Sequence, residues 1–189
     1  MSTVNFFSSN KKNHPDQHFL NGLSRFQRIL MVTDGTVTEL LEQYAEETIK
    51  VCKLSEKIDI EFDELLPNHR HHITKSDLPV LTRTILLQGQ TTKKNWLYAQ
   101  SSIFLDNLQA GFRSDLLASR EPIGRLWEKY RCETFKRILD FEKRPAGESG
   151  EYFNLPADST LLSRTYSVYS GGKLIMIITE MFPDELFTD

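Results

Sequence analysis

The chain has few cysteines, no long hydrophobic run and no excess of positive charge, and each absence excludes a class of proteins. Its two cysteines, Cys52 and Cys132, lie far apart in the chain, which predicts two reduced thiols rather than a disulfide framework. No apolar run approaches the roughly 18 residues that a transmembrane helix needs. The net charge of −3 lacks the basic excess that is usual for a nucleic-acid surface. We therefore expect a cytoplasmic protein that binds neither nucleic acid nor membrane.

Motifs for phosphates, serine nucleophiles and metals are also missing. No glycine-rich loop joins a predicted strand to a predicted helix, and no Gly-x-Ser-x-Gly elbow is present. His14 and His18 lie four residues apart, and His69, His71 and His72 form a cluster. Neither group has cysteine or carboxylate partners at zinc-site spacing. We expect no metal and no cofactor.

Length and polarity together predict one domain preceded by a loose arm. A chain of 189 residues, 39% of them hydrophobic, is long enough for one well-buried domain and short for two. Its first residues are polar and lack the apolar core of a signal peptide. We expect a flexible arm over residues 1–18 and a single domain over residues 19–189.

Short runs of β-forming residues, bounded by turn residues, predict strands in both halves of the chain. These runs cover residues 52–62, 81–88, 95–104, 161–169 and 173–180. The second and third are separated only by the polar loop at residues 89–94, and the last two only by a turn at Gly171 and Gly172. Both pairs are therefore expected to form antiparallel hairpins.

Helical periodicity of the apolar residues predicts helices between and before these hairpins. The helical stretches are residues 19–30, 36–49, 105–117 and 122–139, with Pro122 suited to a first helical turn. Residues 143–156 are expected to form a loop, and residues 181–189 a short acidic tail. Because the strands come as hairpins, we expect an α+β domain: an antiparallel sheet with helices packed on one face.

Three of the predicted strands carry one charged residue on an otherwise apolar face. Side chains alternate between the two faces of a strand, which places Arg83, Arg164 and Glu180 among apolar neighbours. A buried charge is costly unless a partner compensates it. The planar guanidinium of arginine suits a carboxylate, and a glutamate can act as acid, base or hydroxyl partner. These charges predict a pocket for a small anionic, hydroxylated molecule.

The same pattern is also consistent with a purely structural role. Arg83 and Glu180 could form a buried salt bridge, an arrangement that seldom adds stability over apolar replacements. Arg164 lies close to a strand end, where a long side chain can reach water while its stem stays buried. The sequence leaves both interpretations open.

Four segments, taken in order, resemble the chorismate pyruvate-lyase family, and more closely its cyanobacterial-type and uncharacterised branch. They read TDGTVT at residues 33–38, LTRTILL at 81–87, EPIGRL at 121–126, and SRTY through ITEMFP at 163–183. Each motif alone is weak, but their order and spacing make the set specific. The resemblance implies an antiparallel sheet whose helices and flap segments enclose a buried site.

The resemblance also implies an activity and a set of contacts. The family removes pyruvate from chorismate without a cofactor and leaves 4-hydroxybenzoate. Its arginine for the ring carboxylate matches Arg83, and its glutamate near the ring hydroxyl matches Glu180. Its backbone contacts at a helix start and at a proline-containing turn match Val37 and Ile123.

One position departs from the family's pattern. A second arginine, which would help to bind the other carboxylate of chorismate, matches Gln100 here. Arg164 is a candidate to replace it. Two alternatives therefore stand beside the lyase: an enzyme of a biosynthetic pathway with a changed substrate, and a non-catalytic protein that binds aromatic acids. The sequence does not indicate an oligomeric state.

Overall fold

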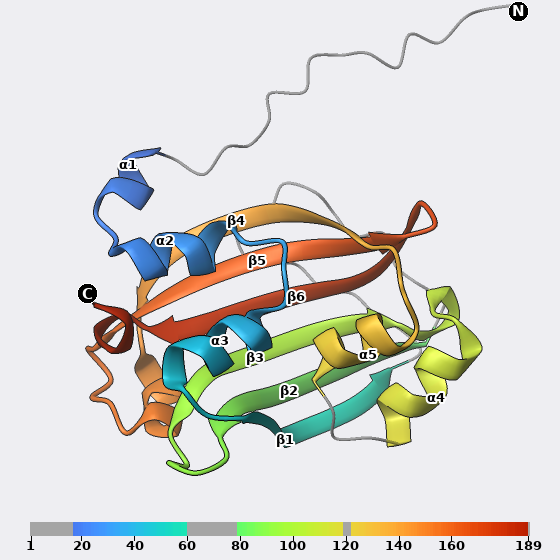
Figure 1. Cartoon of the computed structure of the whole chain (residues 1–189), viewed down its shortest axis with the longest axis horizontal. Coiled ribbons are helices and arrows are strands. Elements are labelled where there is room, and N and C mark those ends of the chain that lie inside the picture. Colours follow the sequence, from blue (N-terminus) through green and yellow to red (C-terminus); the bar gives the residue numbers. More distant parts are fainter. Residues whose placement is uncertain (1–16, 60–78, 119–121, 189) are drawn as a thin grey trace, which may run out of the picture.

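Six antiparallel strands form one sheet with helices across one face (Figure 1). The computed structural model describes residues 17–59, 79–118 and 122–188. In the sheet, the strands follow the order β1-β2-β3-β6-β5-β4. Their bounds are β1 Ile49–Asp59, β2 Val80–Gly89, β3 Asn95–Phe104, β4 Phe135–Pro145, β5 Thr160–Ser170 and β6 Lys173–Pro183. The predicted α+β class is confirmed.

The helices are short, and three of them lie over the same face of the sheet. Figure 1 shows α2, α3 and α5 crossing that face, with α4 beside α5 at one end. The α-helices are α1 Gln17–Asn21, α2 Arg25–Val32, α3 Val37–Ala45, α4 Ala110–Ala118 and α5 Ile123–Lys129. Three 3-10 helices complete the list: η1 Leu105–Asn107, η2 Gly147–Phe153 and η3 Asp184–Phe187. Among the described residues, none of the helices is long and apolar enough to cross a membrane.

The predicted helix over residues 122–139 is wrong beyond its first two turns. Helix α5 ends at Lys129, and Arg131 adopts a left-handed backbone with a φ of 47°. The chain then enters β4, in which Ile138 lies opposite Tyr166 of β5. The error arose because apolar residues of the strand happen to continue the helical spacing. The predicted loop at residues 143–156 is also partly wrong, since it contains the end of β4 and the helix η2.

The predicted acidic tail is instead part of the folded structure. Strand β6 continues to Pro183, and η3 places Phe187 in the core with no exposed surface. The ring of Phe187 lies 5.3 Å from that of Tyr44, 5.7 Å from Phe26 and 5.9 Å from Trp96, measured between centroids. The acidic residues around it made this segment look solvent-exposed in the sequence.

Helix α2 is joined to the same C-terminal segment by polar contacts. Ser24 caps the helix, and Ser24 and Gln27 each bond the other's backbone N–H through their side chains. The Gln27 amide also donates to the backbone and side-chain oxygens of Asp184, both at 2.8 Å. Gln27 thus takes part in capping the start of α2 and also holds the C-terminal segment against that helix.

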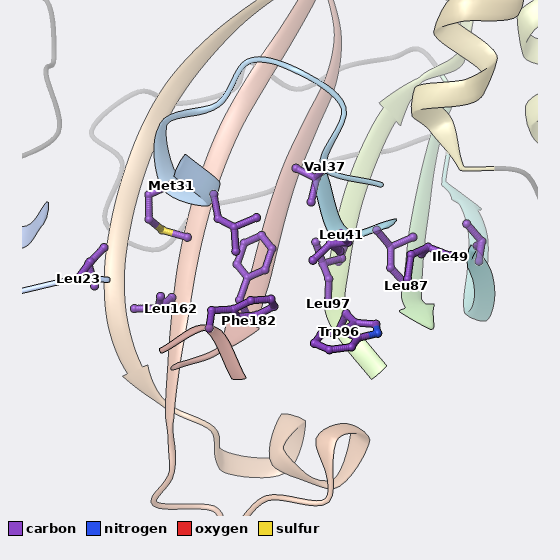
Figure 2. Close-up of a cluster of buried hydrophobic side chains, with 14 residues drawn as sticks. Leu23, Met31, Val37, Leu41, Ile49, Leu87, Trp96, Leu97, Leu162 and Phe182 are labelled. Atoms are coloured by element: carbon purple, nitrogen blue, oxygen red, sulfur yellow. The ribbon is translucent and has the colours of Figure 1, made fainter. Parts of the chain in front are cut away.

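Two separate apolar clusters lie under the helices. One cluster contains Leu30, Met31, Leu41, Leu97 and Phe182, and Figure 2 shows its side chains between the sheet and the α2–α3 segment. The other gathers under α4 and α5 and includes Ile103, Phe112, Leu116, Leu126 and Met176. The two clusters are separate. The polar residues Arg83, Ser101 and Glu180 lie between them on the face of the sheet that the helices cover.

Replacing Phe187 with alanine is expected to lower the free energy of unfolding by about 3–5 kcal/mol, because a fully buried ring is lost. Urea denaturation of the purified protein measures this change. Phe135→Ala is the matched control, since this ring is 66% exposed and its loss should change stability by no more than about 0.5 kcal/mol. Equal effects of the two variants would show that the C-terminal segment is not part of the core.

Candidate active site

Strand register brings Arg83 and Glu180 onto the face that the helices cover. Arg83 of β2 lies opposite Ser101 of β3, and Ala99, two residues earlier, lies opposite Glu180 of β6. Directly opposed residues share a face of the sheet. Both side chains therefore point to the same side, separated by the width of β3.

A cavity lies between this part of the sheet and the starts of α3 and α5. Its floor comes from the strands and its roof from the segments around the two helix starts. Its lining residues include Gly35, Val37, Arg83, Ile123, Trp127, Lys136, Tyr166 and Glu180. The cavity occupies the junction between the two apolar clusters, so its walls are apolar while its ends carry charge.

Close packing of the two helix starts forms the roof. A Cβ atom added to Gly124 would lie only 2.3 Å from Cγ2 of Thr36, so a glycine is needed where α5 meets the segment before α3. The Thr36 side chain makes no capping bond, although Thr36 occupies the cap position of α3. Val37 and Ile123, the two positions predicted for backbone contacts, both line the cavity.

Arg83 is a buried cation without a hydrogen bond. Its side chain is 1% exposed, and none of its three guanidinium nitrogens has a hydrogen-bond partner among the described residues. The Glu56 carboxylate lies 3.3 Å from Nε but outside hydrogen-bonding geometry, and it also accepts a bond from Lys53. Burial lowers the pKa of Arg83, and Glu56 opposes that shift. A guanidinium in this state is suited to bind an anion that enters the cavity.

Glu180 is paired with Arg164 rather than with Arg83. Arg164 Nε donates to one carboxylate oxygen at 2.7 Å, and the Tyr166 hydroxyl donates to the other at 2.9 Å. Burial and the Glu180 carboxylate raise the pKa of Tyr166 well above its ordinary value, so the phenol keeps its proton and remains a donor. Glu180 is therefore a fixed hydrogen-bond acceptor at the cavity wall.

Arg164 does not reach water as a strand-end arginine can. Its side chain is 1% exposed, and Nη1 donates to the carbonyl oxygens of Leu30 and Thr33, the latter at 3.0 Å. Leu30 lies in the last turn of α2, and Thr33 directly follows that helix. Arg164 is absent from the cavity lining, so its position supports Glu180 and not a direct contact with a ligand.

Gln100 lies on the other face of the sheet. It is exposed, stands opposite Thr84 and Thr179, and donates to the Tyr98 hydroxyl at 3.0 Å. The position that matches the family's second arginine therefore points away from this cavity. Of the six residues predicted for the site, the cavity contains Arg83, Glu180, Val37 and Ile123.

Lys136 lines the cavity and was missed in the sequence. Its ammonium donates to the Gly35 carbonyl at 2.9 Å and lies 4.9 Å from the centre of the Trp127 ring. Burial lowers its pKa, and the nearby Glu180 carboxylate opposes that shift. The residue was overlooked because it fell within the wrongly predicted helix. Assigned to a strand, it shares an inward face with Ile138.

The structure does not test the prediction that the histidine clusters bind no metal. His14 and residues 69–72 lie outside the described parts of the chain, as does the side chain of His18. Within those parts, no three histidine, cysteine or carboxylate side chains come together as a metal site would require.

Comparison with known proteins gives a family and a fold. The family model described as "Chorismate pyruvate-lyase Rv2949c-like" matches residues 31–188. A chorismate pyruvate-lyase of Mycobacterium leprae is 30% identical over 172 residues, which cover 88% of this chain and 78% of the relative. The corresponding protein of Mycobacterium tuberculosis H37Rv is 29% identical over 177 residues, with 88% and 84% covered.

Solved structures with a similar fold include the ligand-binding domain of a putative GntR-family transcriptional regulator from Bordetella bronchiseptica, with a TM-score of 0.51 at 12% identity and 71% and 82% covered. The effector domain of PhnF from Mycobacterium smegmatis has a TM-score of 0.59 at 12% identity, and the match covers 82% of this chain and 91% of that one. The gene product SA0254 from Staphylococcus aureus has a TM-score of 0.56 at 14% identity, with 74% and 87% covered. At these identities the likeness shows the fold alone.

The contact between Arg164 and Glu180 predicts strong coupling in a double-mutant cycle. Arg164→Met alone should cost about 3–5 kcal/mol of stability, because it leaves the Glu180 carboxylate buried without its cation. Adding Glu180→Gln should recover about 1–3 kcal/mol of the summed losses. Chemical denaturation of the four proteins measures the coupling.

The exposed pair between Arg113 and Asp106, at 2.8 Å, is the control. Arg113→Met and Asp106→Asn should each cost at most about 1 kcal/mol and should couple weakly. Additive losses at Arg164 and Glu180 would contradict the buried pair.

Proposed function

The chain belongs to the Rv2949c-like chorismate pyruvate-lyase family, and we propose that it eliminates pyruvate from chorismate and releases 4-hydroxybenzoate. The family makes it a carbon–oxygen lyase. The observation that carries the assignment of substrate and product is Arg83, a buried guanidinium at the cavity with no hydrogen-bond partner among the described residues. It provides the charge that an aromatic acid or its precursor needs.

In this proposal Arg83 binds the carboxylate on the ring. A carboxylate can accept two parallel bonds from a guanidinium, which would give the buried nitrogens the partners that they lack. The ring itself would lie against Ile85, Leu87 and Leu97, which line the cavity beside Arg83. An apolar wall in the same cavity as a cation suits an acid with an apolar ring.

Glu180 would accept the hydrogen bond of the ring hydroxyl. Arg164 and Tyr166 each hold one of its oxygens, and each oxygen keeps a further lone pair for the substrate. Because Arg164 compensates its charge, Glu180 is suited to orient the hydroxyl rather than to remove a proton. With Arg83 on one side and Glu180 on the other, the ring would be fixed at two opposite positions.

The reaction needs orientation more than chemical assistance. The bond between the ring and the ether oxygen breaks, and the neighbouring ring carbon, which carries the hydroxyl, loses its hydrogen as a proton. The electron pair of that carbon–hydrogen bond completes the aromatic ring, and the proton reaches the methylene carbon of the departing enolpyruvate, which becomes pyruvate. No atom is gained or lost and no electron acceptor is required. Holding the substrate in a reactive, shielded geometry is the main contribution of such a site.

Incubation of the folded protein with chorismate tests this proposal. Pyruvate, detected with lactate dehydrogenase, and 4-hydroxybenzoate, detected by chromatography, should appear in equal amounts. Tight binding of 4-hydroxybenzoate without turnover would instead indicate an aromatic-acid binding protein. The absence of both would leave an enzyme of this fold with a changed substrate.

Arg83→Met should separate activity from stability. The loss of the cation from a buried carboxylate should cost about 2–5 kcal/mol of substrate affinity, which lowers kcat/KM by about 30- to 5,000-fold. Because Arg83 makes no hydrogen bond to the described residues, replacing it with methionine should leave stability unchanged or raise it by up to about 4 kcal/mol. Pyruvate release and urea denaturation measure the two effects.

Arg113→Met serves as the control, because this arginine is exposed and does not line the cavity; neither quantity should change. A protein with Arg83→Met that is strongly destabilised but still converts chorismate would favour the structural role of Arg83 and overturn this assignment.

A further inference from the structure

Chorismate carries two carboxylates, and Arg83 accounts for one of them. Neither position considered in the sequence provides the second cation. Gln100 faces the other side of the sheet, and Arg164 is bound to Glu180 and lies outside the cavity lining. Among the described residues, Lys136 is the remaining cation at the cavity wall.

Lys136 lies at the Glu180 end of the cavity. Its ammonium is close enough to the Glu180 carboxylate to interact with it, whereas Arg83 is on β2, which is separated from β4 by β3, β6 and β5. Its Nζ also lies 4.9 Å from the centre of the Trp127 ring and 5.8 Å from that of Tyr166, whose hydroxyl bonds Glu180. The two cavity cations therefore occupy different ends of the site.

The ammonium has unused hydrogen-bonding capacity. It has three N–H donors, and the one bond found for it in the described structure goes to the Gly35 carbonyl at 2.9 Å. No carboxylate among the described residues lies within ion-pair distance of it. Burial lowers the pKa of Lys136, and an incoming anion would restore the stability of its charged form.

The covalent structure of chorismate places its second carboxylate at this end. The enolpyruvyl ether is attached to the ring carbon next to the one that carries the hydroxyl. If the hydroxyl lies at Glu180 and the ring carboxylate at Arg83, the ether and its carboxylate extend from the Glu180 end. That is the end where Lys136 lies.

We propose that Lys136 binds the enolpyruvyl carboxylate and is the residue by which this protein distinguishes chorismate from its aromatic product. The inference rests on the proposed function and deepens it. 4-Hydroxybenzoate has lost this carboxylate, which leaves with pyruvate. Lys136 should therefore contribute to the binding of chorismate but not to that of 4-hydroxybenzoate.

Lys136→Met tests the proposal with two ligands. A charge-assisted hydrogen bond of ordinary strength corresponds to a decrease in affinity for chorismate of about 10- to 150-fold. The Kd of 4-hydroxybenzoate, measured by calorimetry, should stay within about threefold of that of the unaltered protein, which is the normal scatter of a neutral substitution. Lys136→Arg should recover much of the chorismate affinity, because it keeps the positive charge.

Lys143→Met is the matched control. Lys143 lies in the same strand, but its ammonium is exposed and pairs with Asp184 at 3.2 Å. This variant should bind both ligands like the unaltered protein, which shows that loss of a lysine from β4 does not by itself disturb the site.

Two outcomes would overturn the assignment of Lys136. Equal weakening of both ligands would mean that Lys136 acts only by holding the roof through Gly35, and unchanged chorismate affinity would mean that the second carboxylate binds elsewhere. Turnover by the unaltered protein separately tests the proposed function. If that protein binds chorismate without converting it, the ratio of the two dissociation constants still decides the role of Lys136. If it binds neither ligand, both proposals fail.

Discussion

The buried ion pair between Arg164 and Glu180 connects the sheet, the roof and the cavity. The two residues lie directly opposite each other on β5 and β6, and a further bond from Tyr166 fixes the second carboxylate oxygen. The same guanidinium donates to the carbonyls of Leu30 and Thr33, so it holds the end of α2, from which the chain continues to the start of α3. The position of the roof and the position of the acceptor are thus set by one side chain. A polar interaction of this kind is costly to bury, and its effect here is to fix geometry.

The cavity exists because the helical face of the sheet is packed in two pieces. One apolar cluster gathers under α2 and α3, and the other under α4 and α5. Between them the strands present Arg83, Ser101 and Glu180 where a continuous core would have apolar side chains. The segments at the starts of α3 and α5 cover this part of the sheet. They can pack closely against each other because Gly124 has no side chain. The two apolar clusters on either side of the site therefore stabilise the fold, and the site between them can contain polar residues.

The alternation of side chains along strands was enough to predict that Arg83 and Glu180 lie on buried faces of the sheet. Arg83 and Glu180 were both placed on an apolar face from sequence, and both line the cavity. Their partners could not be predicted, because the pairing of Glu180 with Arg164 depends on the register between β5 and β6 and not on either strand alone.

Lys136 could not be predicted as a cavity residue for a different reason. Residues 135–139 have apolar positions that suit both a helix and a strand, and the choice is made by a left-handed residue at Arg131 that no local pattern revealed. Phe187 shows the same limit, since an acidic neighbourhood concealed a fully buried ring.

The charges around the cavity match the charge of a dicarboxylate. Arg164 and Glu180 compensate each other inside the protein, which leaves Arg83 and Lys136 as the cations that face the cavity. Chorismate would bring one carboxylate to each of them. Elimination does not change the total charge, but it divides the dianion into two monoanions that are no longer joined. Each product is then held by a single cation, without the advantage that the second attachment gave to the intact substrate. In the proposed mode of binding, the arrangement would therefore favour binding of the substrate over retention of its products.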